Sequence, residues 1–154
     1  METFGRITGS ASDGSHTKLI DGTATGTFSY MVDHCAISSR GTSMTMRPYL
    51  VMKLNGPNKV LEIQLARRTD GKSESEGQGS NVRVQVADDL NFNIDAPTPM
   101  SVCKEIDQLS GTGLVSYECD HYYVGQYVFF SNDQEELTIC EAKVFVQEGK
   151  LMIT

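Results

Sequence analysis

The residues whose types and spacing could support chemistry lie in one short run, Arg67-Arg68-Thr69-Asp70. The run closes an alternating apolar stretch and opens a segment rich in Gly and Ser. A carboxylate two residues after an arginine can hold that side chain and leave its other N–H donors aimed outward. A fixed fork of donors suits the neighbouring hydroxyls of a sugar. Such Arg–Asp pairs are also common as surface ion pairs, so spacing alone leaves both interpretations open.

Side chains suited to catalysis are present but scattered. The sequence has no GxSxG elbow, HExxH motif, P-loop, GxGxxG turn or EF-hand loop. Its histidines are far apart in sequence, and we expect loop positions for them: His16, His34 and His121. The acidic residues that could pair for acid–base work are Glu74, Glu76, Asp88 and Asp89. A solvated acidic face is the commoner role of such residues, so we expect a protein without enzymatic activity.

Composition and charge exclude several classes of function. The chain has 154 residues, 13 Lys and Arg against 20 Asp and Glu, and a net charge of −7. This balance argues against nucleic-acid binding, which normally needs a basic face. No apolar run approaches the roughly 20 residues of a membrane-spanning helix, so we expect no membrane insertion. The length predicts a single domain over residues 1–154.

The chain has four cysteines, whose bonding state indicates whether the protein resides in an oxidising compartment or in the cytosol: Cys35, Cys103, Cys119 and Cys140. They form no CxxC pair, and no histidine stands at zinc-ligand spacing from them. An even count suggests two disulfides in one of three pairings, and buried free thiols in a cytosolic protein are the alternative. The N-terminal residues lack the pattern of a secretory leader, so Met1 is either a cytosolic start or the replacement for a removed leader.

The sequence pattern predicts that most of the chain's secondary structure is β-strand. Alternating apolar residues predict half-buried strands, and runs rich in aromatic and branched residues predict more fully buried ones. The predicted half-buried strands are 61–65, 82–86 and 142–146. The predicted more fully buried strands are 49–54 and 126–131. One or two helical turns are expected over 101–109. Clusters of Gly, Pro, Asn and Asp predict turns at 21–22, 55–58, 71–80, 95–99 and 110–113, with 71–80 an exposed, mobile loop. The pattern favours an all-β protein, a β-sandwich of jelly-roll type.

Taken in order, several segments resemble the F-type lectins, or fucolectins, a branch of the galactose-binding-like jelly rolls. The matching segments are Ile20-Asp21-Gly22 with Phe28, Pro48–Leu54, Arg68-Thr69-Asp70, Gly125–Val128 and Leu137–Val144. Their order and spacing extend over nearly the whole chain. The resemblance implies a jelly-roll fold and recognition of glycans or glycoproteins.

The resemblance also implies how the cysteines pair. Cys35 should join Cys140, and Cys103 should join Cys119. In the chain-entropy model the long loop closed by the first bridge contributes about 4–5 kcal/mol, and the second about 3 kcal/mol. Such bridges imply an oxidising compartment, and so a secreted or cell-surface protein whose Met1 replaces a removed leader.

The sugar motif departs from the family pattern of His, a long gap, Arg-x-Asp, four residues and a second basic residue. Arg68 and Asp70 match the central part. The second basic position falls on Ser75, and the histidine position falls on Ile37. The adjacent cysteine pair that packs on the sugar in the family is replaced by Gly and Lys at 71–72. We therefore expect changed or reduced fucose specificity.

Other side chains are candidates to complete the pocket. Arg40 lies in a 37–48 segment about four residues longer than usual in the family, and His34 lies beside Cys35. Lys72, in a Gly-flanked loop, is placed to return a cationic donor. Tyr30 stands where the family offers an aromatic ring to the apolar face of the sugar, although ordinary packing explains it equally well.

A structural calcium ion is the one cofactor that the resemblance implies. In the family it is held by loop carbonyls after the Asp-Gly turn and by a carboxylate after the last cysteine. The candidate ligands here are Asp21, Thr23, Cys140 and Glu141. Calcium needs six to eight oxygen ligands, and the segment 23–27 has no acidic residue, so the donor set is reduced.

Together, the residues and the resemblance predict an extracellular domain that recognises glycans through Arg68 and Asp70. The alternative is a protein-interaction or adhesion module on the same fold, with the sugar site lost.

Overall fold

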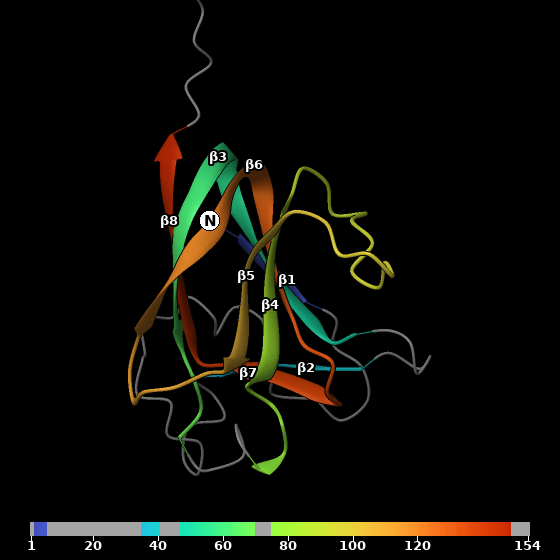
Figure 1. The fold of residues 1–154 in the computed structure, drawn as a ribbon, viewed down its shortest axis with the longest axis vertical. Helices are drawn as coiled ribbons and strands as arrows, with labels where there is room; N and C mark the ends of the chain where they lie inside the picture. The colour runs from blue at the N-terminus through green and yellow to red at the C-terminus, as the bar shows by residue number, and fades with distance from the viewer. Residues whose placement is uncertain (1, 6–34, 41–46, 70–74, 149–154) are drawn as a thin grey trace, which may run out of the picture.

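A computed structural model describes residues 2–5, 35–40, 47–69 and 75–148, which form strands and turns (Figure 1). The strands are β1 (Glu2–Gly5), β2 (Ala36–Ser39), β3 (Tyr49–Ala66), β4 (Ser80–Ala87), β5 (Val102–Gln108), β6 (Val115–Ser131), β7 (Glu136–Ile139) and β8 (Glu141–Glu148). Among these residues no helix is long and apolar enough to cross a membrane. The prediction of an all-β sandwich is confirmed.

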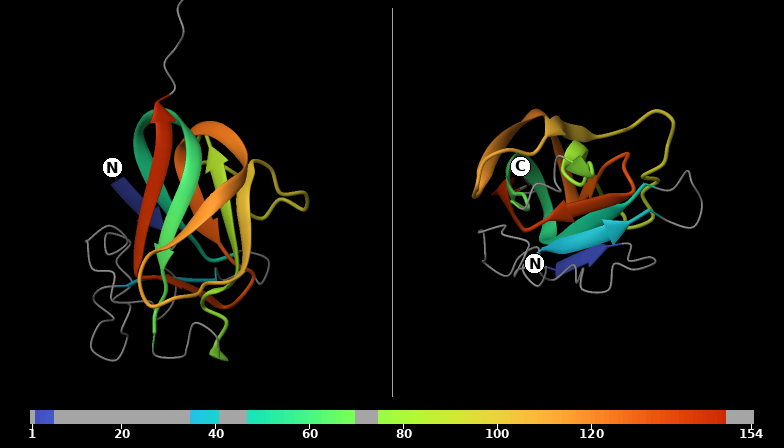
Figure 2. Two further views of the ribbon diagram at one scale, coloured as in Figure 1. Left: turned by 60° about the vertical axis from the view of Figure 1, so that its left-hand side comes forward. Right: turned by 90° about the horizontal axis from the view of Figure 1, so that it is seen from below.

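Two long antiparallel strands, β3 and β6, run through both layers of the sandwich. The first part of β3, at Tyr49–Lys53, pairs with β6 and β1, and the later part, at Asn58–Ala66, pairs with β6 and β8. The wider layer contains the path β1-β3-β6-β4-β5 of the six-stranded sheet, in which β8 also pairs with β3. Strands β2 and β7 form a separate two-stranded sheet. Both long strands fold over at the same end of the molecule (Figure 2). The register shifts there, between Lys53 and Asn58, so the turn predicted at 55–58 is a bend within one strand.

The core lies between the layers and includes several of the residues predicted to face inward, although Val146 is 38% exposed. Val82, Val84 and Val86 of β4 are fully or almost fully buried, as are Ile63 and Leu65 of β3. Each such side chain contributes about 1.5–3 kcal/mol relative to an exposed one. Because β4 alternates, burying its valines turns Arg83 and Gln85 to the opposite face. The core therefore fixes which polar residues of β4 lie on the opposite face, where Arg83 is partly exposed and Gln85 is buried.

The helical turns predicted over 101–109 are absent, because this segment is strand β5, paired with β4. Cys103 and Ile106 are both buried, a spacing of three that imitates a helix. The register shift between Val84 and Gln85 is the cause, since it places an extra β5 residue opposite β4 and interrupts the alternation.

Both disulfide pairings are as predicted. Cys35, at the start of β2, is bonded to Cys140, between β7 and β8, and Cys103 of β5 is bonded to Cys119 of β6. None of the four cysteines is free. The alternative of buried thiols is therefore wrong for this structure.

The segment between β4 and β5 covers part of the outer face of the wider layer. Its Phe92 and Ile94 pack with Val51 and Phe129, and the ring centroids of Phe92 and Phe129 are 5.2 Å apart. This second, smaller core anchors the 88–101 segment beside the outward-facing polar residues of β4.

Candidate functional site

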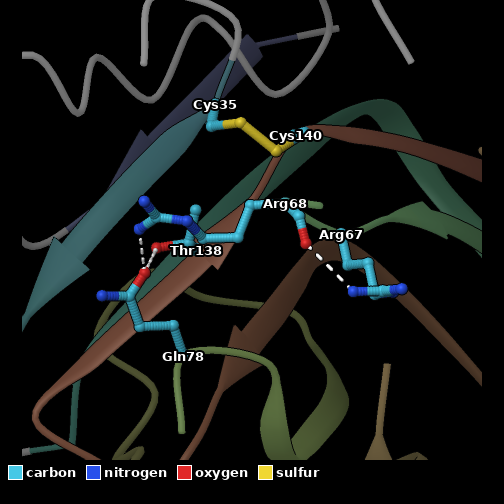
Figure 3. The surroundings of a disulfide bond; sticks show 6 residues. All are labelled: Cys35, Arg67, Arg68, Gln78, Thr138 and Cys140. Carbon is cyan, nitrogen blue, oxygen red and sulfur yellow. Dashed lines mark hydrogen bonds between the residues drawn. A yellow bond between two sulfur atoms is a disulfide. The ribbon is translucent and has the colours of Figure 1, made fainter. Parts of the chain in front are cut away.

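Arg68 follows the end of β3 and is only 2% exposed. Its Nη1 donates a hydrogen bond to Oε1 of Gln78, which also accepts from the hydroxyl of Thr138 at 2.8 Å. Figure 3 shows this group beneath the Cys35–Cys140 disulfide. Arg68 is therefore buried in the described part of the chain, and the predicted sugar contact through Arg68 and Asp70 stays a prediction.

Gln78 extends the network from Arg68 toward the surface. Its Nε2 donates to Oε2 of Glu76 at 3.0 Å and to Oε1 of Glu136 at 3.1 Å. The other carboxylate oxygen of Glu136 accepts from Ser39 at 3.4 Å, so the network reaches both strands of the β2–β7 pair. Part of the predicted exposed loop at 71–80 is therefore buried, with Gln78 only 3% exposed, while 70–74 lie outside the described residues.

The turn between β6 and β7 is held by the buried side chain of Asn132. Its Nδ2 donates to the carbonyls of Glu136 at 2.9 Å and Gly77 at 3.3 Å, and its Oδ1 accepts from the backbone N–H of Gln134 at 3.3 Å. The arrangement fixes the turn while leaving Asp133 at its exposed tip. The Arg68 network thus supports the backbone that presents Asp133.

Arg40, a predicted substitute in the sugar pocket, lies against this same turn. Its backbone N–H donates to the carbonyl of Glu135 at 2.8 Å, and its Nη2 donates to the carbonyl of Asp133 at 2.7 Å. These bonds hold the side chain at the end of β2, next to Arg47 and Arg83.

Two adjoining hollows of about 270 and 300 Å³ share Arg47, Arg83 and Asp133. We call them together the arginine cleft. Its polar lining residues are Arg40, Arg47, Asn81, Arg83, Asp95, Glu105, Asp107 and Asp133. The cleft lies along β4 and β5 and is bordered by part of the 88–101 segment, at 95–99. Cationic, anionic and amide groups are thus gathered around one small volume.

Arg47 is the half-buried centre of this cleft. Its backbone N–H donates to Oδ1 of Asp95 at 2.7 Å, and its Nε donates to the hydroxyl of Ser131 at 3.4 Å. Burial lowers the pKa of Arg47, and the guanidinium of Arg83 lowers it further, against the opposing effect of Asp133. An arginine pKa is so high that the side chain stays charged, and the shift reports crowding of like charges.

Asp133 is held ionised on the rim. Partial burial raises its pKa, but hydrogen bonds from Gln134 and Asn81 and the nearby Arg47 outweigh that effect, so the pKa lies below its ordinary value. The Nδ2 of Asn81 lies 3.2 and 3.3 Å from the two carboxylate oxygens. Asn81 has a φ of 53°, a left-handed conformation that Asn tolerates better than most residues.

The remaining predicted site residues are mostly outside the described part of the chain: Asp21, Thr23, Tyr30, His34, Asp70 and Lys72. Of the predicted calcium ligands, Cys140 is in its disulfide and Glu141 is 2% exposed, with Oε1 accepting from the N–H of Ala142 at 3.2 Å. One buried carboxylate is compatible with a hard cation, but among the described residues no group of three or more His, Cys, Asp or Glu side chains could hold a metal ion. The calcium site stays a prediction.

Sequence reasoning missed Arg47, Asn81, Arg83 and Asp133. Arg83 carried a signal, because it occupies an outward position of an alternating strand. The others come from segments far apart in sequence, and nothing local in the chain brings them together.

The sequence matches no protein-family model and no curated protein. Among solved structures, a fucolectin from striped bass (Morone saxatilis) serum is similar, with a TM-score of 0.69 and 20% identity over 95% of this chain. This chain spans only 45% of that fucolectin chain. A fucose-binding module of Streptococcus pneumoniae has a TM-score of 0.68 and 18% identity, covering 95% of this chain and 91% of the module.

The lectin domain of lectinolysin, in complex with Lewis b antigen, has a TM-score of 0.69 and 16% identity, covering 95% of this chain and 92% of that domain. At these identities the comparisons establish the fold. The resemblance seen in the sequence is confirmed at that level: this chain has the jelly-roll fold of the F-type lectins and related carbohydrate-binding modules.

Proposed function

We propose that this chain is a non-catalytic carbohydrate-recognition domain and that the arginine cleft is its sugar-contacting surface. The observation that carries the proposal is the placement of guanidinium groups beside an ionised carboxylate around hollows of about 270 and 300 Å³. Proteins of the same fold are described as a fucolectin and a fucose-binding module, which supports the same class of ligand.

The chemistry of the cleft suits a sugar ring. Each sugar hydroxyl both donates and accepts a hydrogen bond, so neighbouring hydroxyls pair well with a donor and an acceptor held side by side. Arg83 supplies donors and Asp133 supplies acceptors, and both line the two hollows. Hydrogen bonds to charged groups contribute about 1.5–3 kcal/mol each, which gives weak affinity for a single sugar.

In this proposal Arg68 has a positioning role. It bonds to Gln78, which bonds to Glu136 at the base of the turn that carries Asp133. Fucose specificity is expected to be changed or reduced, because only the central part of the family motif remains. The two disulfides favour an extracellular or cell-surface location.

The direct test is a glycan array with calcium present, comparing the wild type with Arg83→Ala and Lys143→Ala. Lys143 is an exposed lysine on β8, outside the cleft, and so serves as the matched control. We expect Arg83→Ala to weaken binding about tenfold, the loss of about 1.4 kcal/mol. We expect Lys143→Ala to bind like the wild type, and free L-fucose to show whether fucose competes. Equal binding by all three proteins would contradict the site.

A third hollow favours the alternative of a protein-interaction module. It has a volume of about 330 Å³ and is lined by residues from both ends of the 88–101 segment, Phe92 among them, and by Tyr123 of β6. Met100 and Val124 beside it are 65% and 56% exposed. If this surface carries the function, Met100→Ser with Val124→Thr should abolish attachment to cells while sugar binding is absent from the array.

A further inference from the structure

The charged groups of the arginine cleft are not evenly distributed in depth. The side chains of Arg40 and Arg83 are 17% and 19% exposed, whereas that of Glu105 is 62% exposed. These two arginines therefore lie deeper in the cleft than Glu105, which lies at the rim. Solvent screens the exposed carboxylate far more than the partly buried guanidinium groups.

Arg83 has donors to spare. Its Nε donates to Oε1 of Glu105 at 3.2 Å, and this bond fixes the orientation of the guanidinium plane. Its Nη1 and Nη2 make no hydrogen bond with the described part of the chain. A largely buried guanidinium with two such groups is suited to an oxyanion, two oxygens of which it binds through paired N–H donors.

The crowding of positively charged arginines in the cleft also favours binding of an anion. Arg47 lies close enough to Arg83 and Arg40 for both to oppose its protonation, although Asp133 and Asp95 offset part of this repulsion. Three of the six arginines of an acidic chain are gathered here. Like charges held together cost free energy, and a bound negative group would relieve that cost.

We propose that the arginine cleft selects sugars carrying an oxyanion, either a carboxylate or a sulfate ester, with Arg83 and Arg47 as the contacts to the anion. This inference rests on the proposed glycan-binding function and specifies its ligand. The acidic rim and the net charge of −7 disfavour densely charged polyanions, so the fitting ligand is a single charged sugar residue within a neutral glycan.

The test uses matched pairs of sugars that differ by one charge. Calorimetric titration compares methyl glucuronide with methyl glucoside, and a sulfated methyl galactoside with methyl galactoside. We expect at least one charged sugar to bind about tenfold more tightly than its neutral partner, with the preference shrinking as salt is raised. The two pairs separate carboxylate recognition from sulfate recognition.

Variants assign the preference to named residues. Arg83→Gln should remove the preference for the charged sugar, and Glu105→Gln should increase it by removing a rim carboxylate. Arg67→Gln is the control, because Arg67 lies outside the cleft and its Nε donates to the carbonyl of Gly111 at 2.8 Å. Circular dichroism melting confirms that each variant is folded.

The outcomes separate this inference from the proposed function. Equal affinity for charged and neutral sugars would overturn the inference while leaving glycan binding intact, and so would a preference that persists in Arg83→Gln. Absence of binding to any sugar, here and on the array, would overturn both.

Discussion

At the scale of single residues, the adjacent arginines 67 and 68 have opposite roles. Arg68 is 2% exposed and bonded to Gln78, whereas Arg67 is partly exposed and bonds to backbone carbonyls of Gly111 and Arg68. The sequence singles out this pair, but alternation at a strand end does not say which member turns inward. Burial of Arg68 depends on β7 and the 75–80 segment, which are distant in sequence.

The difference in burial between Arg68 and Arg67 predicts that alanine substitutions at the two positions have different effects on stability. Arg68→Ala removes a charged donor and leaves Gln78 without it, so we expect a loss of about 2–3 kcal/mol in the free energy of unfolding. For a chain of this size that corresponds to about 4–12 °C in melting temperature. Arg67→Ala should cost less than about 1 kcal/mol. Thermal melts of the two variants side by side test this, and equal losses would contradict the buried role of Arg68.

The pKa of Asp133 predicts how binding responds to pH. Because the folded pKa lies below the ordinary value of 3.8, Asp133 stays ionised throughout the neutral and mildly acidic range. Its contribution is lost only as the pH falls through that lowered pKa. Sugar affinity should therefore be constant between about pH 5 and 8. A midpoint near 6.5 would instead indicate a histidine in the site, for which His34 is the candidate.

At the scale of elements, the pairing of β4 with β6 places Arg83 opposite Ser131. Gly125 of β6 approaches the end of β4 so closely that a Cβ atom there would lie 2.7 Å from the carbonyl oxygen of Ala87. The obstacle is backbone, which cannot rotate away. Alternation of apolar residues predicts that both strands exist, but their separation follows from packing that no local pattern records.

Gly125→Ala should therefore destabilise the protein by about 1–3 kcal/mol through forced separation of the strands. Gly113→Ala is the control, because a Cβ there would meet nothing within 4 Å. That variant should be neutral or slightly stabilising. Urea unfolding of both variants measures the difference, and an undisturbed Gly125→Ala would show that β4 and β6 are not packed as described.

The pairing of β4 with β5 also explains why helical turns were wrongly predicted over 101–109. A spacing of three between buried residues is a helical signal in sequence, and here it arises from a register shift in a strand pair. Shifts of this kind depend on the partner strand, so they escape any reading of one segment alone.

At the scale of the whole molecule, the fold was largely predictable and the arginine cleft was not. Strand patterns and the order of family-like segments extend along the chain, so both the sandwich and the disulfide pairing could be inferred. The cleft instead combines residues of β4, β5, the β6–β7 turn, the 95–99 stretch and the segments around Arg40 and Arg47. Such a site exists only after folding, and diverged family motifs point elsewhere.

The disulfides should account for much of the stability. Cys35–Cys140 closes a sequence separation of 105 residues and Cys103–Cys119 one of 16, which the chain-entropy model converts to about 4–5 and 3 kcal/mol. Reduction should lower the melting temperature by more than about ten degrees. Calorimetry with and without reductant tests this, with thiol counting by mass spectrometry to confirm each state. An unchanged melting temperature would contradict the expected contribution of the bridges.

The position of the bound sugar on the protein can be mapped by NMR spectroscopy. Nitrogen-15-labelled protein is titrated with the strongest glycan from the array while backbone amide shifts are followed. We predict that the largest shifts fall on 81–83, 95–99, 105–107 and Asp133, the residues around the arginine cleft. Shifts confined to the hollow beside Met100 and Val124, or absent from the cleft, would contradict sugar binding in the arginine cleft.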